Sequence, residues 1–237
     1  MTTRLVTWNL ERKKPSTPRG AEALDYVFGL GADVMVLTEA RTSMPPREGH
    51  LLWCEPPKGT HFGEDERKVL VWSKNEWTEI DRVGIEGLDG TRFISGTTQT
   101  PLGPLRVIGV CIPWHMAEVS YPTGEKRKPW ELHIHFLGRL EELIGGFDGP
   151  TVIAGDFNQQ VPRVSYGRKD AAAALTRAFA PLDVVTSGHI EGGRGPGIDH
   201  IAISRDLTAR RVWGWANDVT GARLSDHDGA ACELELG

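Results

Sequence analysis

The chain has 237 residues, of which 39% are hydrophobic and 25% are charged. This is ordinary usage for a globular protein, so the chain can bury a full core and wholesale disorder is excluded. The formal net charge of -5 excludes a general basic surface for nucleic acid, so a polyanion would have to be held locally. No linker interrupts the sequence, and we expect residues 1–237 to form one domain.

The three cysteines, Cys54, Cys111 and Cys232, are scattered at unrelated spacings. Their spacing argues against both a disulfide framework and a zinc cluster, and reduced thiols are expected. Met1 leads directly into a strand-like run, and no apolar run approaches the ~20 residues of a membrane span. We therefore expect a soluble, cytoplasmic protein with no membrane partner, and no obligate protein partner is evident.

The chain begins with a strand and a basic, Pro-punctuated loop at 12–19, after which apolar residues recur at helical spacing. Later segments rich in β-branched residues are separated by Pro, Gly and charged loops, and their number predicts more than one sheet. The expected strands are 4–8, 34–37, 51–54, 68–73, 92–98, 105–112, 151–154, 182–185, 198–203, 212–215 and 230–236, and the expected helices are 21–30, 130–143 and 171–179.

The stretch from Val152 to Asn158 carries the strongest chemical signal. It is a buried-strand pattern followed by Gly155, which permits an unusual backbone angle, and then by Asp156 and Asn158. Residues two apart in an extended chain point to the same side, so this carboxylate and carboxamide would project together from the end of the strand. Such a pair is half of a phosphoryl-transfer site, although Gly-Asp-x-Asn is equally good turn chemistry.

Four other polar clusters also stand where a strand ends or begins. Asn9 follows the first strand, Glu39 follows the second, Asp199 heads an apolar strand, and Asp226 with His227 precedes the last strand. Each one alone is compatible with a turn, a solvated strand end or a surface ion pair. Five such clusters together indicate a site.

The clusters form a set of short motifs whose order and placement resemble the endonuclease/exonuclease/phosphatase superfamily. That superfamily includes pancreatic-type DNases, apurinic/apyrimidinic endonucleases, inositol-polyphosphate 5-phosphatases and sphingomyelinases. The resemblance implies an α/β fold of the DNase-like kind, a four-layer α/β/β/α sandwich of two mixed sheets flanked by helices. The motifs are Thr7-Trp8-Asn9, Leu37-Thr38-Glu39-Ala40, Gly155-Asp156-Phe157-Asn158, Ile198-Asp199-His200-Ile201 and Ser225-Asp226-His227.

The resemblance also implies a cofactor, Mg²⁺ or Mn²⁺, with Glu39 as its principal ligand and Asn9 and Asp226 beside it. Oxygen donors suit such hard cations. In the implied reaction a water attacks phosphorus in line. Asp156 orients or deprotonates that water, and Asn158 fixes Asp156 or donates to the phosphate.

The two remaining implied catalytic residues are His227 and Asp199. His227 contacts the phosphate, and Asp199 holds its imidazole in one tautomer and favours its charged form. Whether the histidine is a base or an electrostatic clamp stays open.

One position departs from the family pattern. Family members generally present a His or Tyr at the end of the strand that corresponds to 107–112, and the slot here holds Cys111. A thiol is a poor hydrogen-bond donor. His115, four residues on, is a candidate replacement, with a plain loop residue as the alternative.

Substrate selectivity is expected in the loops around the site. Basic side chains with aromatic neighbours suit a phosphate backbone and a stacked base, although solvated charged loops would look the same. The candidate substrate-binding residues are Trp114, Lys126, Arg127, Arg163, Tyr166 and Arg168.

The predicted function is that of a metal-dependent phosphodiesterase, an endo- or exonuclease acting on DNA or RNA. The first alternative is a phosphatase or phosphodiesterase of a small phosphorylated metabolite, which the acidic net charge favours. The second is an inactive nucleic-acid-binding module, which Cys111 would explain. The choices between DNA and RNA, between endo- and exo-cleavage, and between one and two metal ions stay open.

Overall fold

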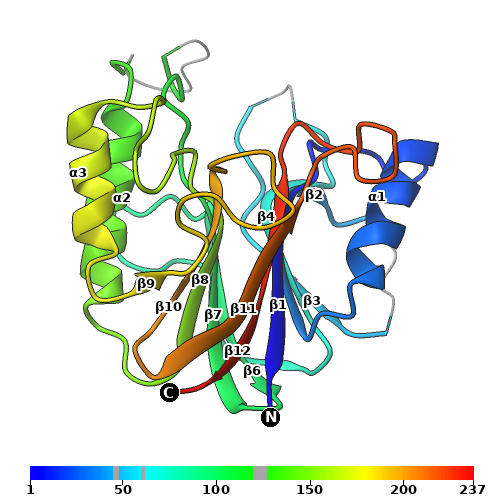
Figure 1. Cartoon of the computed structure of the whole chain (residues 1–237). Coiled ribbons are helices and arrows are strands. Elements are labelled where there is room, and N and C mark those ends of the chain that lie inside the picture. The colour runs from blue at the N-terminus through cyan, green and yellow to red at the C-terminus, as the bar shows by residue number, and fades with distance from the viewer. Residues whose placement is uncertain (45–47, 60–61, 120–126) are drawn as a thin grey trace.

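A computed structural model of the chain describes residues 1–44, 48–59, 62–119 and 127–237. These ranges contain three helices and twelve strands, most of which are labelled in Figure 1. The helices are α1 (Pro18–Gly29), α2 (Glu131–Ile144) and α3 (Lys169–Ala178), and the strands are β1 (Thr3–Asn9), β2 (Val34–Arg41), β3 (His50–Trp53), β4 (Glu66–Ser73), β5 (Trp77–Asp81), β6 (Phe93–Thr100), β7 (Gly103–Cys111), β8 (Thr151–Asp156), β9 (Asp183–Val184), β10 (Asp199–Ile203), β11 (Leu207–Trp215) and β12 (Gly229–Leu236).

The strands form two sheets of six strands each. The first sheet has the order β11-β12-β1-β2-β4-β3, and the second has the order β5-β6-β7-β8-β10-β9. Each sheet contains one parallel pair, β1 with β2 and β7 with β8, among antiparallel neighbours. Both sheets are therefore mixed, as predicted.

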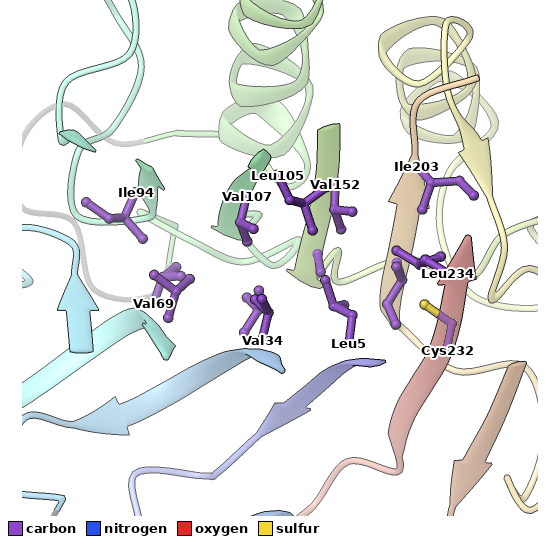
Figure 2. Close-up of a cluster of buried hydrophobic side chains, with 14 of the residues drawn as sticks. Leu5, Val34, Val69, Ile94, Leu105, Val107, Val152, Ile203, Cys232 and Leu234 are labelled. Carbon is purple, nitrogen blue, oxygen red and sulfur yellow. The ribbon is translucent and has the colours of Figure 1, made fainter. Parts of the chain in front are cut away.

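The two sheets pack face to face, and helices cover their outer faces (Figure 1). Leu5, Val34 and Val69 of the first sheet meet Val107 and other apolar side chains of the second sheet between the layers (Figure 2). Because side chains alternate along a strand, the neighbouring residues point outwards and pack under helices instead. Helix α1 covers the first sheet, and α2 and α3 cover the second. The predicted four-layer α/β/β/α sandwich is confirmed.

The structure differs from the sequence-based prediction at several elements, among them β5, α1 and β9. Strand β5 was not predicted, because its sequence Trp-Thr-Glu-Ile-Asp is largely polar and the strand lies exposed at a sheet edge. Helix α1 begins at Pro18, inside the expected loop, because Thr17 caps it by accepting a hydrogen bond from the Gly20 amide at 3.2 Å. Strand β9 has only two residues, where four were expected.

The strand ends that carry the polar motifs meet at one rim of the sandwich. Strand β1 ends at Asn9, and β12, which is antiparallel to it, begins at Gly229, just after His227. In the second sheet, Asp156 at the end of β8 is paired with Asp199 at the start of β10. Both chain termini lie at the opposite end (Figure 1).

No helix in the described ranges combines the length and the apolar character that crossing a membrane requires.

Candidate functional site

A pocket of about 1270 Å³ opens at this rim. Residues from both sheets line it, and they include most of the predicted catalytic and metal-binding side chains: Asn9, Glu39, Asp156, Asn158, Asp226 and His227. Asp199 lies behind His227 and is only 5% exposed. The structure therefore brings the five sequence motifs into one place.

Asp156 is held rigidly at the end of β8. The backbone amide of Asn158 donates to its Oδ1 at 2.8 Å, and the Asn158 and Asn9 carboxamides donate to its Oδ2 at 3.0 and 3.3 Å. The contact from Asn9 crosses from the first sheet to the second. Donors from both sheets therefore fix the orientation of the Asp156 carboxylate.

The proximity of Asn158 to Asp156 arises differently from the prediction. Strand β8 ends at Asp156, and Asn158 has a left-handed φ of 51°, so the two residues are not two steps along an extended chain. The bond from the Asn158 amide to Asp156 is the turn interaction that the sequence offered as an alternative. The turn itself builds the pair, and the Asn158 carboxamide also donates to the carbonyl of Ile112 at 2.8 Å.

The environment of Asp156 changes its acidity. Burial and the nearby Asp199 carboxylate raise the pKa of Asp156 to about 7, although His227 and the Asn158 amide oppose the rise. A carboxylate with a pKa near neutrality can accept a proton from water and later release it.

His227 and Asp199 form a hydrogen-bonded ion pair. Nδ1 of His227 donates to Oδ2 of Asp199 at 2.5 Å, which fixes the ring orientation and leaves Nε2 for a ligand in the pocket. Burial alone would lower the pKa of His227, but Asp199, Asp156 and Asp226 outweigh it and raise the pKa to about 10. The imidazole is therefore an imidazolium at neutral pH. The other oxygen of Asp199, Oδ1, is buried without a hydrogen-bond partner among the described residues.

The segment that carries His227 is fastened to the first strand. Ser225 donates its hydroxyl to the carbonyl of Asn9 at 2.6 Å and accepts from the His227 amide at 3.1 Å. The indole of Trp8 donates to the carbonyl of His227 at 2.9 Å. These contacts explain why the first and last motifs lie together.

Glu39 has a left-handed φ of 47° and is paired with two cations. Nζ of Lys68 lies 2.6 Å from Oε1, and Nε of Arg12 lies 3.3 Å from Oε2. Burial alone would raise the pKa of Glu39, but Lys68 and Arg12 hold it below its usual range. Neither cation was predicted from the sequence as part of the site. Lys68 lies beside Glu39 because β4 pairs with β2, and this pairing is not visible in either segment alone.

The oxygen donors at the rim suit a hard divalent cation. Glu39, Asn9 and Asp226 line the same pocket, and the ionised Glu39 carboxylate can serve as a ligand. Oδ1 of Asn9 accepts from the Glu11 amide at 2.8 Å and keeps a second lone pair. A second set of acidic and histidine ligands consists of Asp156, Asp199 and His227, whose ligand atoms lie within 4.8 Å of one another. To bind a metal ion, this set would first have to lose the proton that His227 and Asp199 share. The first set therefore fits a metal ion better.

The predicted substrate-binding residues divide into two groups. Trp114, which is 42% exposed, and Arg127 line the pocket, and Arg127 also pairs with Glu131 at 3.0 Å. Arg163 donates to the carbonyl of Gly167, and Arg168 pairs with Asp170 and donates to the carbonyl of Pro129. Neither arginine is among the described residues that line the pocket. Lys126 lies outside the described residues.

The structure does not bring His115 to the pocket as a phosphate contact. Its Nδ1 is hydrogen-bonded to the hydroxyl of Tyr166 at 2.8 Å, and its ring stacks on Trp130 with centroids 5.6 Å apart. It is not among the described residues that line the pocket. His115 and Tyr166 instead hold two loops together beside the rim.

A family model described as Endonuclease/Exonuclease/phosphatase family matches residues 6–227. The chain belongs to this family. Members of the Endonuclease/Exonuclease/phosphatase family are hydrolytic phosphoesterases and generally depend on a divalent metal ion, which agrees with the donors at the rim. No curated protein matches the sequence closely enough to count as a relative.

Several solved structures share the fold of this family member. An AP endonuclease from Archaeoglobus fulgidus aligns with a TM-score of 0.71 at 14% identity, over 97% of this chain and 98% of that one. A humanized TDP2 from D. rerio aligns with a TM-score of 0.73 at 12% identity, over 99% of both chains. The 3′ phosphatase NExo from Neisseria, bound to a product DNA hairpin, aligns with a TM-score of 0.66 at 16% identity, over 99% of both chains. At these identities the likeness establishes the fold alone.

Proposed function

We propose that the chain is an Mg²⁺- or Mn²⁺-dependent phosphodiesterase that cleaves nucleic acid. The observation that carries this proposal is the shared pocket, in which a positioned carboxylate, Asp156, and a charged imidazolium, His227, lie beside the oxygen donors Glu39 and Asn9. This arrangement supplies a proton acceptor, a phosphate clamp and metal ligands within one space.

The residues divide the chemistry between them. Asp156 accepts a proton from the attacking water while the oxygen of that water forms the new bond to phosphorus. The ester oxygen on the opposite side of the phosphorus leaves. Nε2 of His227 donates to a phosphoryl oxygen, and Asp199 keeps that ring charged and oriented. With a pKa of about 10, His227 acts as a clamp because a protonated ring has no lone pair with which to accept a proton.

Glu39, Asn9 and Asp226 would hold the metal ion, which supplies charge stabilisation for the phosphoryl and leaving oxygens when it is bound. Lys68 and Arg12 keep Glu39 ionised. The lowered pKa of Glu39 makes this ligand available to the metal ion across the physiological pH range.

The size of the pocket favours a polymer over a small ester. Its volume of about 1270 Å³ exceeds the roughly 300–1,000 Å³ of ordinary small-molecule sites, and Trp114 exposes an indole at its wall on which a base can stack. Among structures of the same fold, a D. rerio TDP2 holds a single-strand DNA product, and the Neisseria 3′ phosphatase holds a DNA hairpin.

A small phosphorylated metabolite is the second candidate substrate. Glu55 and Asp89 line the pocket, and the net charge of -5 would repel a long polyanion outside the immediate site. This candidate predicts hydrolysis of small phosphate esters without cleavage of nucleic acid.

We expect the purified chain to cleave supercoiled plasmid, single-stranded DNA, abasic duplex or RNA when Mg²⁺ or Mn²⁺ is present. Asp156→Asn and His227→Ala should each lower kcat about 100- to 10,000-fold, because the first removes the proton acceptor and the second removes the phosphate clamp. Initial rates on the four substrates, with and without EDTA, measure these effects.

Arg177→Gln is a matched surface control, since Arg177 is largely exposed on α3 and should leave the rates unchanged. Hydrolysis only of small esters would establish the second candidate. Metal and nucleic-acid binding without turnover of either substrate class would identify an inactive binding module and contradict the proposal. Full cleavage by Asp156→Asn would also contradict it.

A further inference from the structure

Arg92 stands directly before β6 and lines the pocket next to Cys111. The backbone amide of Cys111 donates to the carbonyl of Arg92 at 3.0 Å, so the two residues are held side by side. Nη1 of Arg92 donates back to the carbonyl of Cys111 at 3.2 Å and lies 3.9 Å from its sulfur. The guanidinium therefore lies over the end of β7.

Cys111 itself offers little to a phosphate. It pairs in register with Asp156 across the parallel strands β7 and β8, and both residues line the catalytic pocket. Its side chain is buried, and burial together with the charge of Asp156 raises the pKa of the thiol to about 12. A neutral thiol is a weak donor, which leaves this position without its own group for an anion.

Arg92 has N–H donors beside Cys111 that are available to an anion. Its Nε lies 3.4 Å from Oδ2 of Asp89, and its side chain is 14% exposed. In the part of the chain that the structure describes, its Nη2 makes no hydrogen bond or ion pair. Arginine presents its donors as a planar fork that matches two phosphoryl oxygens.

Lys68 is a second cation near Cys111. The positive charges of Lys68 and Arg92 both act on the Cys111 thiol, and both side chains line the pocket. Lys68 forms an ion pair with Glu39 at 2.6 Å, whereas the ion pair of Arg92 among the described residues, with Asp89, is longer at 3.4 Å. Of these two cations, Arg92 is therefore better able to bind an anion beside Cys111.

We propose that Arg92 is a phosphate-binding residue that serves at the end of β7 in place of a donor at Cys111. This inference rests on the proposed function, because it names a substrate contact of that same site. Arg92, which adjoins β6 of the second sheet, and His227, which adjoins β12 of the first sheet, would then both hold phosphoryl oxygens of the substrate.

The test uses the full chain with two measurements, the binding of inorganic phosphate followed by ³¹P line broadening and the steady-state cleavage of nucleic acid. Arg92→Gln should weaken phosphate binding about 10- to 100-fold and lower kcat/KM to a similar extent, because it removes a charge-assisted fork. For Arg92→Lys, phosphate binding and kcat/KM should lie between those of the wild type and those of Arg92→Gln, since lysine keeps the charge and loses the fork.

Two variants separate phosphate binding from a structural role. Asp89→Asn removes the ion pair of Arg92 and keeps an oxygen that can accept from Thr91, so it should leave phosphate binding as strong as in the wild type or stronger. Cys111→Ala removes the thiol but not the carbonyl that Arg92 contacts, and it should change phosphate binding less than twofold. Arg177→Gln should change neither measurement.

The outcomes for Arg92 and for the proposed function are distinguishable. Unchanged phosphate binding by Arg92→Gln, or a loss with Cys111→Ala larger than the loss with Arg92→Gln, would overturn the role of Arg92 while wild-type cleavage stands. A loss of phosphate binding with Arg92→Gln in a chain that hydrolyses nothing would support the anion contact and refute the proposed function. An equal loss with Asp89→Asn would assign Arg92 to loop structure instead.

Discussion

His200 is a buried residue behind the site whose hydrogen bonds fix its protonation. Its Nε2 donates to the carbonyl of Gln159 at 3.1 Å, so its Nδ1 must accept from the hydroxyl of Thr186 at 3.1 Å. Burial lowers the pKa of His200 to about 4. The folded chain therefore keeps this imidazole neutral well below the pH at which an exposed histidine is protonated.

This pKa makes the stability of the chain dependent on pH. Between the unfolded pKa of about 6.5 and the folded pKa of about 4, the unfolded state binds a proton that the folded state does not bind. His200 should therefore contribute a fall of up to about 3 kcal/mol to the free energy of unfolding as the pH is lowered through this window, while the raised pKa of Asp156 contributes a slope of the opposite sign. Urea unfolding at pH 7.5, 6 and 4.5 measures the slope.

His200→Gln should be less stable at pH 7.5, and its free energy of unfolding should fall less, or rise more, than that of the wild type between pH 6.5 and 4, because the amide does not titrate. His189→Gln is the matched control, since His189 is exposed and bonds only to the neighbouring carbonyl, and it should keep the wild-type slope. Burial also lowers the pKa of His133, so part of the slope should survive in His200→Gln. Identical slopes in the wild type and His200→Gln would contradict the assignment.

On the acid side of the pH profile, kcat/KM should depend on the ionisation of Asp156. Because burial and Asp199 raise its pKa to about 7 and the group accepts a proton only when ionised, kcat/KM should rise with pH up to about 7. A bound divalent cation would favour the ionised form and move this limb to lower pH. Rates between pH 4.5 and 8.5 at saturating Mg²⁺ measure the limb, and a rate that falls as pH rises from 5 to 7 would exclude Asp156 as the proton acceptor.

Residue by residue, the sequence predicted the groups that follow or head a strand and missed those that reach the pocket from elsewhere. Asn9, Glu39 and Asp156 stand out because a polar side chain there follows an apolar run. Lys68 and Arg92 look like ordinary charges at the start of a strand, and only the pairing of strands places them in the pocket. The path of the loop that carries His115 could not be read from its residues.

At the scale of single elements, the end of β8 depends on a glycine. Gly155 has φ +134°, and a Cβ at this position would lie 2.0 Å from the carbonyl oxygen of Val110, its partner on β7. A side chain there would force the two strands apart directly beside Asp156. The unusual backbone angle expected from the sequence is confirmed.

Gly155→Ala should therefore lower the free energy of unfolding by about 3 kcal/mol or more and reduce cleavage. Gly149→Ala is the matched control, because Gly149 also has a positive φ, +81°, but a Cβ added there would meet no atom within 4 Å, and it should cost only about 1 kcal/mol. Urea unfolding and cleavage rates measure both variants. Equal losses in the two would show that backbone angle, and not the contact with Val110, is decisive.

The sequence predicted the existence of elements with a strong apolar pattern more accurately than their first and last residues. Strands β2, β4, β7 and β8 are apolar because both faces are covered, one by the other sheet and one by helices. Strand β5 has no such cover and therefore no such pattern. A polar edge strand differs little from a loop in its sequence.

At the scale of the whole molecule, the two sheets share one interior. Gly109 lacks a side chain where a Cβ would lie 2.6 Å from Val69 of the facing sheet, and Val107 packs in the same layer (Figure 2). We propose that residues 1–237 fold as a single domain, because among the residues that the structure describes each sheet covers this apolar face of the other.

Unfolding in urea should therefore give coincident transitions by far-ultraviolet circular dichroism and by tryptophan fluorescence. Val107→Ala, which removes two buried methyl groups between the sheets, should lower the free energy of unfolding by about 2 kcal/mol and shift both transitions together. Separate midpoints for the two signals would contradict a single cooperative unit.

The contact between Trp8 and His227 joins positions 219 residues apart, and the other site residues lie between them in sequence. A ribosome that has made Asn9, Glu39, Asp156 and Asp199 has not yet made a working site, since the imidazolium and its neighbour Asp226 are still to come. Translation therefore delays hydrolytic activity until nearly all of this sequence has been synthesised.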